Sequence, residues 1–149
     1  MIRLLLLLTL FAPMTLAQQT LASYIDRNRV LLVFAPNDEN PRYQQQLTFL
    51  NHHAAEVKER DLIILPVLID PGPPITPNTM RVTFGPGLPE QEQMLARHRF
   101  KVGPTEFTTL LVGKDGGEKL RSHQPLSIEE LNRTIDAMPI RQQEMRKQP

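Results

Sequence analysis

Residues 30–41 read VLLVFAPNDENP, and this stretch decides the fold. Its first five residues, Val30–Phe34, form a continuous apolar run, which is the pattern of a strand buried on both faces of a sheet. A polar, turn-forming segment follows, and Pro41 then occupies the position of a first helical residue, with Asn40 as its N-cap. We therefore predict a central strand that leads through a short loop into a helix.

The helix that begins at Pro41 is predicted to end near Arg60. Its apolar residues recur at intervals of three and four, so they lie on one stripe that packs against the sheet. They are Tyr43, Leu47, Leu50, Ala54 and Val57. A second strand, Leu62–Ile69, should run parallel to the first through a right-handed crossover. Pro66 cannot donate a hydrogen bond to a neighbouring strand, which places this second strand at the edge of the sheet.

The segment Asp70–Pro89 contains six prolines and three glycines, so regular structure is excluded over most of its length. A short strand at Thr79–Phe84 is the one element that we expect within it. Two interpretations stay open for the segment. It is either a lid that binds a ligand mainly through Phe84–Leu88, or a disordered segment.

A short helix, Glu90–Arg99, is predicted next, with Met94, Leu95 and His98 on one side. This placement makes His98 a partly buried histidine. The basic residues Arg97, Arg99 and Lys101 are interpreted as a solvated helix end.

A hairpin and a final helix complete the predicted domain. Phe107–Val112 and Glu118–Arg121 are expected to form antiparallel strands joined by a tight turn at 115–117. Ser127 and Glu130 form a capping box for a helix that Pro139 ends. The apolar stripe of that helix comprises Ile128, Leu131, Ile135 and Met138. The domain should therefore cover residues 18–140, followed by a polar, mobile tail at 141–149.

The amino-terminal residues 1–17 are typical of a secretory signal peptide. Arg3 precedes the apolar run Leu4–Ala12, and Thr15-Leu16-Ala17 places small residues where a signal peptidase reads. We expect cleavage after Ala17, and export to the periplasm or the medium with no membrane span left. The 132 residues that remain carry 16 basic and 16 acidic side chains, a balance that does not predict nucleic-acid binding.

The absence of cysteine from all 149 residues limits the chemistry directly. Thiol-disulfide exchange and thiol peroxidase activity both need a thiolate nucleophile, so both are excluded. A small exported domain without disulfides must also be held together by its hydrophobic core.

The order of predicted elements, together with local sequence, resembles the thioredoxin fold. Phe34–Asp38 resembles the start of the active-site helix in thioredoxins and peroxiredoxins, and Thr109–Gly116 resembles the strand and turn after their cis-proline. More specifically, Leu111–Gly117, together with residues 125–127, 135–139 and 144–146, resembles the bacterial domain-of-unknown-function family 4174. This resemblance covers nearly all of the chain after residue 17.

The resemblance implies an α/β, thioredoxin-like fold: a mixed four-stranded sheet flanked by helices, with one extra short strand as an option. It also implies an extracellular setting, because a related domain occurs in vertebrate sushi-repeat-containing extracellular proteins. It implies no activity. The chain departs from redox thioredoxins in both halves of their site: no residue from Asn37 to Tyr43 is a cysteine, and Thr108 falls at the position of their cis-proline.

The candidate site lies where the central strand meets the first helix, because open α/β sheets bind ligands at the carboxyl ends of their strands. Its members are Asn37, Asp38, Glu39, Arg42 and Thr108. An anion at the helix start is one interpretation. The other is that Asp38 and Glu39 only complement the helix dipole while Arg42 is solvated.

No metal, cofactor or catalytic residue is predicted. His52 and His53 are adjacent and point in different directions on a helix, so they do not converge on one ion. Three hypotheses follow: a non-catalytic module that binds a protein partner or a ligand, a non-thiol enzyme that uses Asp38, Glu39, Arg42 and His98, and a structural envelope protein.

Overall fold

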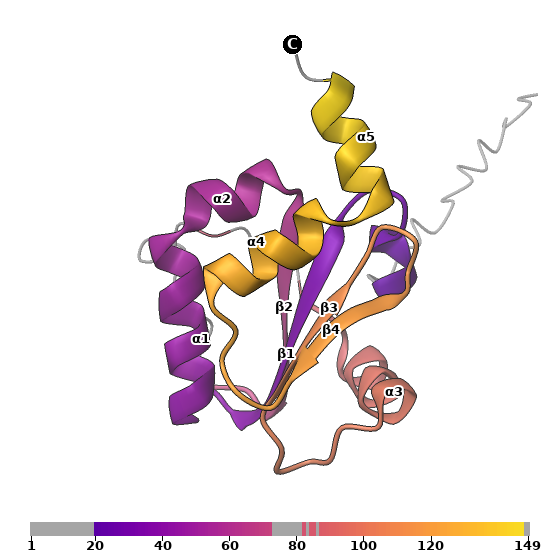
Figure 1. Ribbon diagram of the computed structural model, residues 1–149. Coiled ribbons are helices and arrows are strands. Elements are labelled where there is room, and N and C mark those ends of the chain that lie inside the picture. The colour runs from indigo at the N-terminus through magenta and orange to yellow at the C-terminus, as the bar shows by residue number, and fades with distance from the viewer. Residues whose placement is uncertain (1–19, 73–81, 83, 86, 148–149) are drawn as a thin grey trace, which may run out of the picture.

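The computed structural model describes residues 20–72, 82, 84–85 and 87–147 (Figure 1). Four strands form one mixed sheet in the order β2-β1-β3-β4. They are β1 (Arg29–Asn37), β2 (Leu62–Asp70), β3 (Thr108–Val112) and β4 (Glu118–Ser122). β1 pairs in parallel with β2 and antiparallel with β3, while β3 and β4 form an antiparallel hairpin. The predicted inner position of β1, the outer position of β2 and the hairpin are therefore confirmed.

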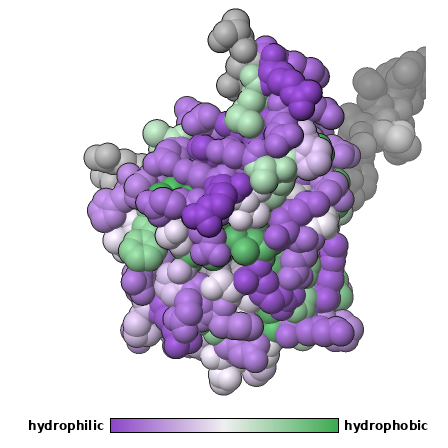
Figure 2. Space-filling view, viewed as in Figure 1, coloured by the Kyte–Doolittle hydropathy of each residue, from purple (hydrophilic) through white to green (hydrophobic). Residues whose placement is uncertain are grey.

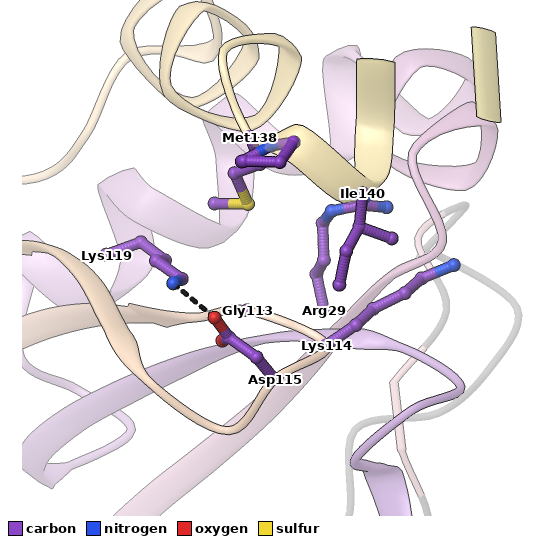
Figure 3. Close-up of a pocket in the computed structure, with 8 residues that line it drawn as sticks. Arg29, Gly113, Lys114, Asp115, Lys119, Met138 and Ile140 are labelled. Atoms are coloured by element: carbon purple, nitrogen blue, oxygen red, sulfur yellow. Dashed lines mark hydrogen bonds and ion pairs between the residues drawn. The ribbon is translucent and has the colours of Figure 1, made fainter. Parts of the chain in front are cut away.

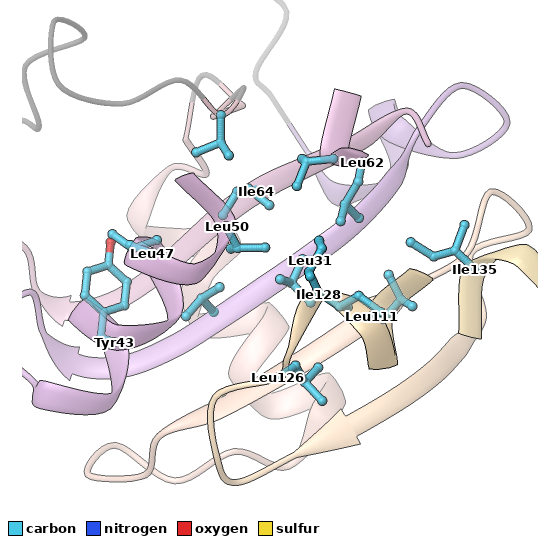
Figure 4. Packing of buried hydrophobic residues seen from close by; sticks show 14 of the residues in the cluster. Leu31, Tyr43, Leu47, Leu50, Leu62, Ile64, Leu111, Leu126, Ile128 and Ile135 are labelled. Carbon is cyan, nitrogen blue, oxygen red and sulfur yellow. The ribbon is translucent and has the colours of Figure 1, made fainter. Parts of the chain in front are cut away.

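Helices cover both faces of the sheet, which explains why the first seven residues of β1 are buried. The helices α1 (Pro41–His52), α2 (Ala54–Glu59) and α4 (Ile128–Asp136) contribute to the core on one face. The short 3-10 helix η1 (Leu21–Tyr24) and α3 (Glu90–Phe100) contribute to the core on the other. Figure 4 shows the first core, where Leu31 lies among side chains of α1 and α4. Alternate β1 residues supply the two cores, as a strand's geometry requires.

The predicted helix 41–60 is broken at His53. This residue leaves helical geometry (φ −112°, ψ 31°) and separates α1 from α2. Its ring Nδ1 lies 2.8 Å from Oε1 of Glu56, so its side chain bonds locally at the break. The predicted apolar stripe nevertheless faces the core, since four of its members are buried and Ala54 is partly buried.

The prediction for α3 is wrong about which side faces the protein. Met94 and Leu95 are 64% and 54% exposed, and His98 is also exposed. Ala96, Arg97 and Phe100 are buried instead. Ala96 and Phe100 contribute to the core on this face of the sheet, and the Arg97 guanidinium donates hydrogen bonds to backbone carbonyls of Ala35 and Val67. Arg97 is therefore not part of a solvated helix end.

The carboxyl-terminal residues also differ from the prediction. The side chain of Ser127 caps α4 as expected, and α4 ends at Asp136, ahead of Pro139. Pro139 then begins another helix, α5 (Pro139–Lys147), in the segment that we expected to be a mobile tail. Arg141 on this helix is only 2% exposed, because ion pairs hold its guanidinium against the domain.

The predicted strand at Thr79–Phe84 lies mostly outside the described residues. Phe84 forms a parallel bridge with Ile64 of β2, and the N–H of Gly85 donates to the Ile64 carbonyl at 3.0 Å. Leu88 is buried in the core beneath α3. The described apolar residues of Phe84–Leu88 thus pack into the domain.

Candidate functional site

The loop after β1 positions the start of α1 at the end of the sheet where the parallel strands β1 and β2 finish. The Asn40 side chain accepts hydrogen bonds from the N–H groups of Arg42 (3.1 Å) and Tyr43 (3.2 Å). Pro41 has no N–H group, and that of Gln44 donates to the Asn40 carbonyl at 3.0 Å. The amides that a helix start normally leaves free are therefore already satisfied. Ligand recognition at this end must come from side chains.

Asp38 packs on the β2 side of this loop. A Cβ atom at Gly72 would lie 2.0 Å from Oδ2 of Asp38, so the carboxylate occupies the space that this glycine leaves. The hydroxyl group of Tyr43 is buried, with no hydrogen-bond partner among the described residues. Burial, together with the nearby charge of Asp38, raises the pKa of Tyr43 to about 12. Tyr43 therefore stays neutral and belongs to the core.

Thr108 and Arg42 meet on the β3 side of the loop through His123. The Thr108 side chain is fully buried, and its Oγ1 lies 3.1 Å from Nδ1 of His123. The Arg42 guanidinium donates to the His123 backbone carbonyl at 3.5 Å. Arg42 and His123 are both exposed. This end of the sheet thus presents a guanidinium and an imidazole, with a buried hydroxyl group behind them.

The structure therefore divides the sequence-predicted residues into two groups. Arg42 and Thr108 belong to one arrangement, while Asp38 packs toward Gly72 on the other side of the loop. Glu39 is exposed, and Asn37 ends β1 opposite Asp70. The fully buried hydroxyl of Thr108 is not accessible as a nucleophile in this conformation.

His123 is a site residue that the sequence analysis missed. No local sequence signal gives this contact, because the hairpin register shifts between Leu111 and Val112 and thereby places Thr109 opposite Ser122. Extending that pairing by one residue brings Thr108 beside His123. The predicted strand ended at Arg121, so His123 lay outside every predicted element and was not considered as a site residue.

Arg97 is the second residue that was missed. It binds backbone carbonyls near the ends of the two strands that lead into the site. Its Nη2 donates to the carbonyls of Ala35 (2.7 Å) and Val67 (2.8 Å), and its Nη1 donates to the carbonyl of Gly103 (2.8 Å). The guanidinium also lies 5.5 Å from the centre of the Phe34 ring. Burial lowers the pKa of Arg97. Arg97 thus fixes the ends of β1 and β2 immediately before the loop.

The remaining histidines lie elsewhere. His98 is exposed on α3, which packs on the face of the sheet opposite α1, and His52 is exposed at the end of α1. Among the described residues, no group of three or more His, Asp or Glu side chains is arranged to hold a metal ion. Within the same part of the chain, no helix combines the length and apolar character needed to cross a bilayer.

Solved structures share this fold. The chain matches reduced 2-Cys peroxiredoxin of Plasmodium vivax with a TM-score of 0.57 and 17% identity, covering 84% of each chain. It matches the thioredoxin domain of a thiol-disulfide oxidoreductase from Bacteroides vulgatus with a TM-score of 0.52 and 13% identity, covering 78% of this chain and 81% of that one. These likenesses confirm the thioredoxin-like fold, and the present chain lacks the cysteines on which thiol chemistry depends.

Sequence comparison identifies relatives as well. The chain is 34% identical over 130 residues to coiled-coil domain-containing protein 80 of Danio rerio, a match that covers 80% of this chain and only 15% of that protein. The profile of the family described as "Domain of unknown function (DUF4174)" matches residues 20–144. The chain belongs to the DUF4174 family.

Proposed function

We propose that this protein is an exported, non-catalytic binding module that contacts a protein partner through Arg42 and His123. The observation that carries the proposal is the Arg42–His123–Thr108 arrangement at the carboxyl end of the sheet. The absence of cysteine supports a binding role over the thiol chemistry named for the similar structures. The residues before position 20 support export through their signal-peptide pattern.

The side chains of the site favour a partner that offers carboxylate groups. A guanidinium has five N–H donors in a planar fork that matches a carboxylate. At Arg42, one nitrogen contacts the His123 carbonyl at the long distance of 3.5 Å. The exposed imidazole belongs to the same residue whose carbonyl Arg42 contacts, and its Nδ1 lies 3.1 Å from Oγ1 of Thr108. A carboxylate on the partner's surface would therefore accept from Arg42, with His123 as a neighbouring donor.

The surface of the domain supports a polar contact. The face shown in Figure 2 is mostly hydrophilic, with hydrophobic residues confined to small separate areas. Contacts dominated by charged and polar groups, such as the one we propose, give specificity and fast association more than high affinity. We therefore expect a reversible complex that weakens with increasing salt.

Cross-linking in cells tests this proposal. The tagged full chain is expressed in its host, cross-linked, purified and analysed by mass spectrometry. Proteins captured by the wild type should be lost with Arg42→Ala and retained with Lys58→Ala, a control that removes an exposed cation on α2. If the same proteins are captured with all three chains, or none is captured with any, the site at Arg42 is not the binding surface.

A further inference from the structure

The carboxyl-terminal helix α5 is attached to the domain by charged side chains rather than by apolar packing. Arg141 is the one buried residue of this fully described helix, while its large apolar side chains, Ile140 and Met145, are each 40% exposed. Each of the other described helices buries at least one apolar side chain. Figure 1 shows α5 at the end of the sheet where β1 begins, with its last turns extending away from the domain. A nine-residue helix is only marginally stable alone, so α5 depends on its charged contacts.

Two cations of the domain hold the carboxylate of Glu144 on α5, one at each oxygen. Nη2 of Arg29, at the start of β1, donates to Oε2 at 3.2 Å, and Nζ of Lys114, in the β3–β4 turn, donates to Oε1 at 2.6 Å. Both cations also have contacts outside α5. Nη1 of Arg29 donates to the Arg60 carbonyl at 2.9 Å. Nζ of Lys114 lies 2.9 Å from Oδ2 of Asp61. The domain itself therefore positions two donors for one carboxylate.

These two cations lie deeper than the carboxylate that they hold. The side chains of Arg29 and Lys114 are 0% and 11% exposed, while that of Glu144 is 25% exposed. A buried cation that loses its carboxylate is left as an unpaired charge, so another anion is favoured there whenever α5 departs. A pocket of about 30 Å³, lined by both cations and by Pro139 and Ile140, shows that the first turn of α5 leaves space beside them (Figure 3).

The second anchor of α5 also consists of ion pairs. Arg141, one turn before Glu144, donates to Oε1 of Glu59 at 2.6 Å and to Oδ1 of Asp136 at 3.3 Å. Both of these carboxylates are partly exposed. Ion pairs that water reaches contribute little stability and are screened by salt, and Arg141 regains water when α5 leaves. Charged groups of another molecule can therefore compete with both anchors, whereas a buried apolar anchor would resist them.

We propose that Arg29 and Lys114 form a carboxylate-binding site that Glu144 occupies in this structure, and that an acidic segment of a partner protein displaces α5 from it. A competing carboxylate meets the two nitrogens where the Glu144 oxygens now lie. Because α5 is tethered to the domain, it competes at a high effective concentration, so the partner segment needs several carboxylates. The site lies at the opposite end of the sheet from Arg42 and does not depend on the function proposed there.

Nuclear magnetic resonance on the wild-type protein tests the displacement. The probe is hexaglutamate with blocked ends, and the references are blocked hexaglutamine and sodium chloride at equal ionic strength. Hexaglutamate should move the α5 amide signals saturably toward unfolded positions and shift the Met145 methyl signal. The methyl signal of Met94, which is exposed on α3, should stay unchanged. No response of α5, or an equal response to hexaglutamine or chloride, would overturn the proposal.

Two variants that both loosen α5 distinguish competition at the site from loosening alone. Glu144→Gln weakens only the competing helix, so hexaglutamate should act at about tenfold lower concentration. Lys114→Gln removes a cation from the site as well, so it should gain no such sensitivity. An equal gain in the two variants would show that the peptide binds elsewhere.

Two further variants control for other basic groups. Lys101→Gln removes an exposed cation at the end of α3 and should change nothing. Displacement of α5 should also persist in Arg42→Ala, which assigns it to this end of the sheet. Loss of the effect in either variant would contradict the assignment to Arg29 and Lys114. Partner capture at Arg42 is measured separately, so the two proposals can fail independently.

Discussion

Thr108 and His123 face each other across the β3–β4 hairpin, with the buried hydroxyl of the first 3.1 Å from the ring Nδ1 of the second. The exposed imidazole is therefore oriented from inside the domain. An ordinary surface histidine has no such contact, and its ring samples several rotamers.

Thr108→Val should release the His123 ring with little change in fold. Valine keeps the shape of threonine and removes the hydroxyl, so the cost in unfolding free energy should be about 1 kcal/mol. Partner capture should fall severalfold. The matched control is Thr109→Val, since the neighbouring buried hydroxyl contacts backbone carbonyls instead. Equal capture by both variants would contradict an orienting role for Thr108.

Arg97→Met should be strongly destabilising. The substitution keeps an apolar stem but leaves the carbonyls of Ala35, Val67 and Gly103 without their donor, which should cost about 3 kcal/mol or more in a urea titration. Arg99→Met removes a neighbouring arginine whose contact to the Gly116 carbonyl is exposed, and should cost less than about 1 kcal/mol. Similar losses would show that Arg97 does not fix the strand ends.

Tyr43→Phe should leave the free energy of unfolding unchanged or raise it by up to about 1 kcal/mol, because the hydroxyl is buried without a described partner. Tyr43→Ala should cost about 3–5 kcal/mol, since the ring fills the core. Denaturant unfolding measures both variants. A clear loss of stability in Tyr43→Phe would mean that the hydroxyl group is hydrogen-bonded after all.

Acid should loosen the attachment of α5. Burial alone would raise the pKa of Glu144, but its hydrogen bond from Lys114 and the charge of Arg29 outweigh burial and lower the pKa from 4.5. A carboxylate with a lowered pKa stabilises the fold above its unfolded pKa, and that stability is lost as the pH falls below about 4.5. Asp136, whose pKa is also lowered, acts in the same direction.

Glu144→Gln isolates this contribution. Urea unfolding at about pH 7 and about pH 4 should show a stability decrease in the wild type and a smaller decrease in the variant, which should already be about 1–2 kcal/mol less stable at neutral pH. The same pH dependence in both proteins would show that Glu144 does not hold α5.

Export is tested at the amino terminus. If the signal-peptide pattern is used, the protein recovered from the periplasm or the medium should begin at Gln18 by amino-terminal sequencing. Ala17→Asp should block cleavage and leave the precursor cell-associated. Recovery of the full-length wild type from the cytosolic fraction would contradict export.

Sequence patterns predicted the sheet well because its determinants are local. The apolar run in β1 requires cover on both faces, Pro66 restricts β2 to an outer position, and the turn after β3 specifies the hairpin. α3 and α5 were misjudged for one shared reason. Arg97 and Arg141 are buried because distant carbonyls and carboxylates accept from them, and no local pattern reveals such partners.

The candidate site was predicted in part. The carboxyl end of β1 indicated Arg42, and the fold resemblance indicated Thr108, but their link through His123 depends on the hairpin register. The satisfied amides at the start of α1 were predictable from the sequence, because Asn40 was expected as the N-cap and its side chain accepts from the N–H groups of Arg42 and Tyr43.

Site-specific photo-cross-linking tests the central claim, that the Arg42–His123 surface binds a protein partner. A photoreactive residue is placed at Glu39, which is exposed three residues before Arg42 in the chain, or at the control position Arg146, which is exposed on α5. We predict a cross-linked partner with the probe at 39 that disappears when Arg42→Ala is added, and none with the probe at 146. Capture only from position 146, or capture from 39 that survives Arg42→Ala, would contradict the account.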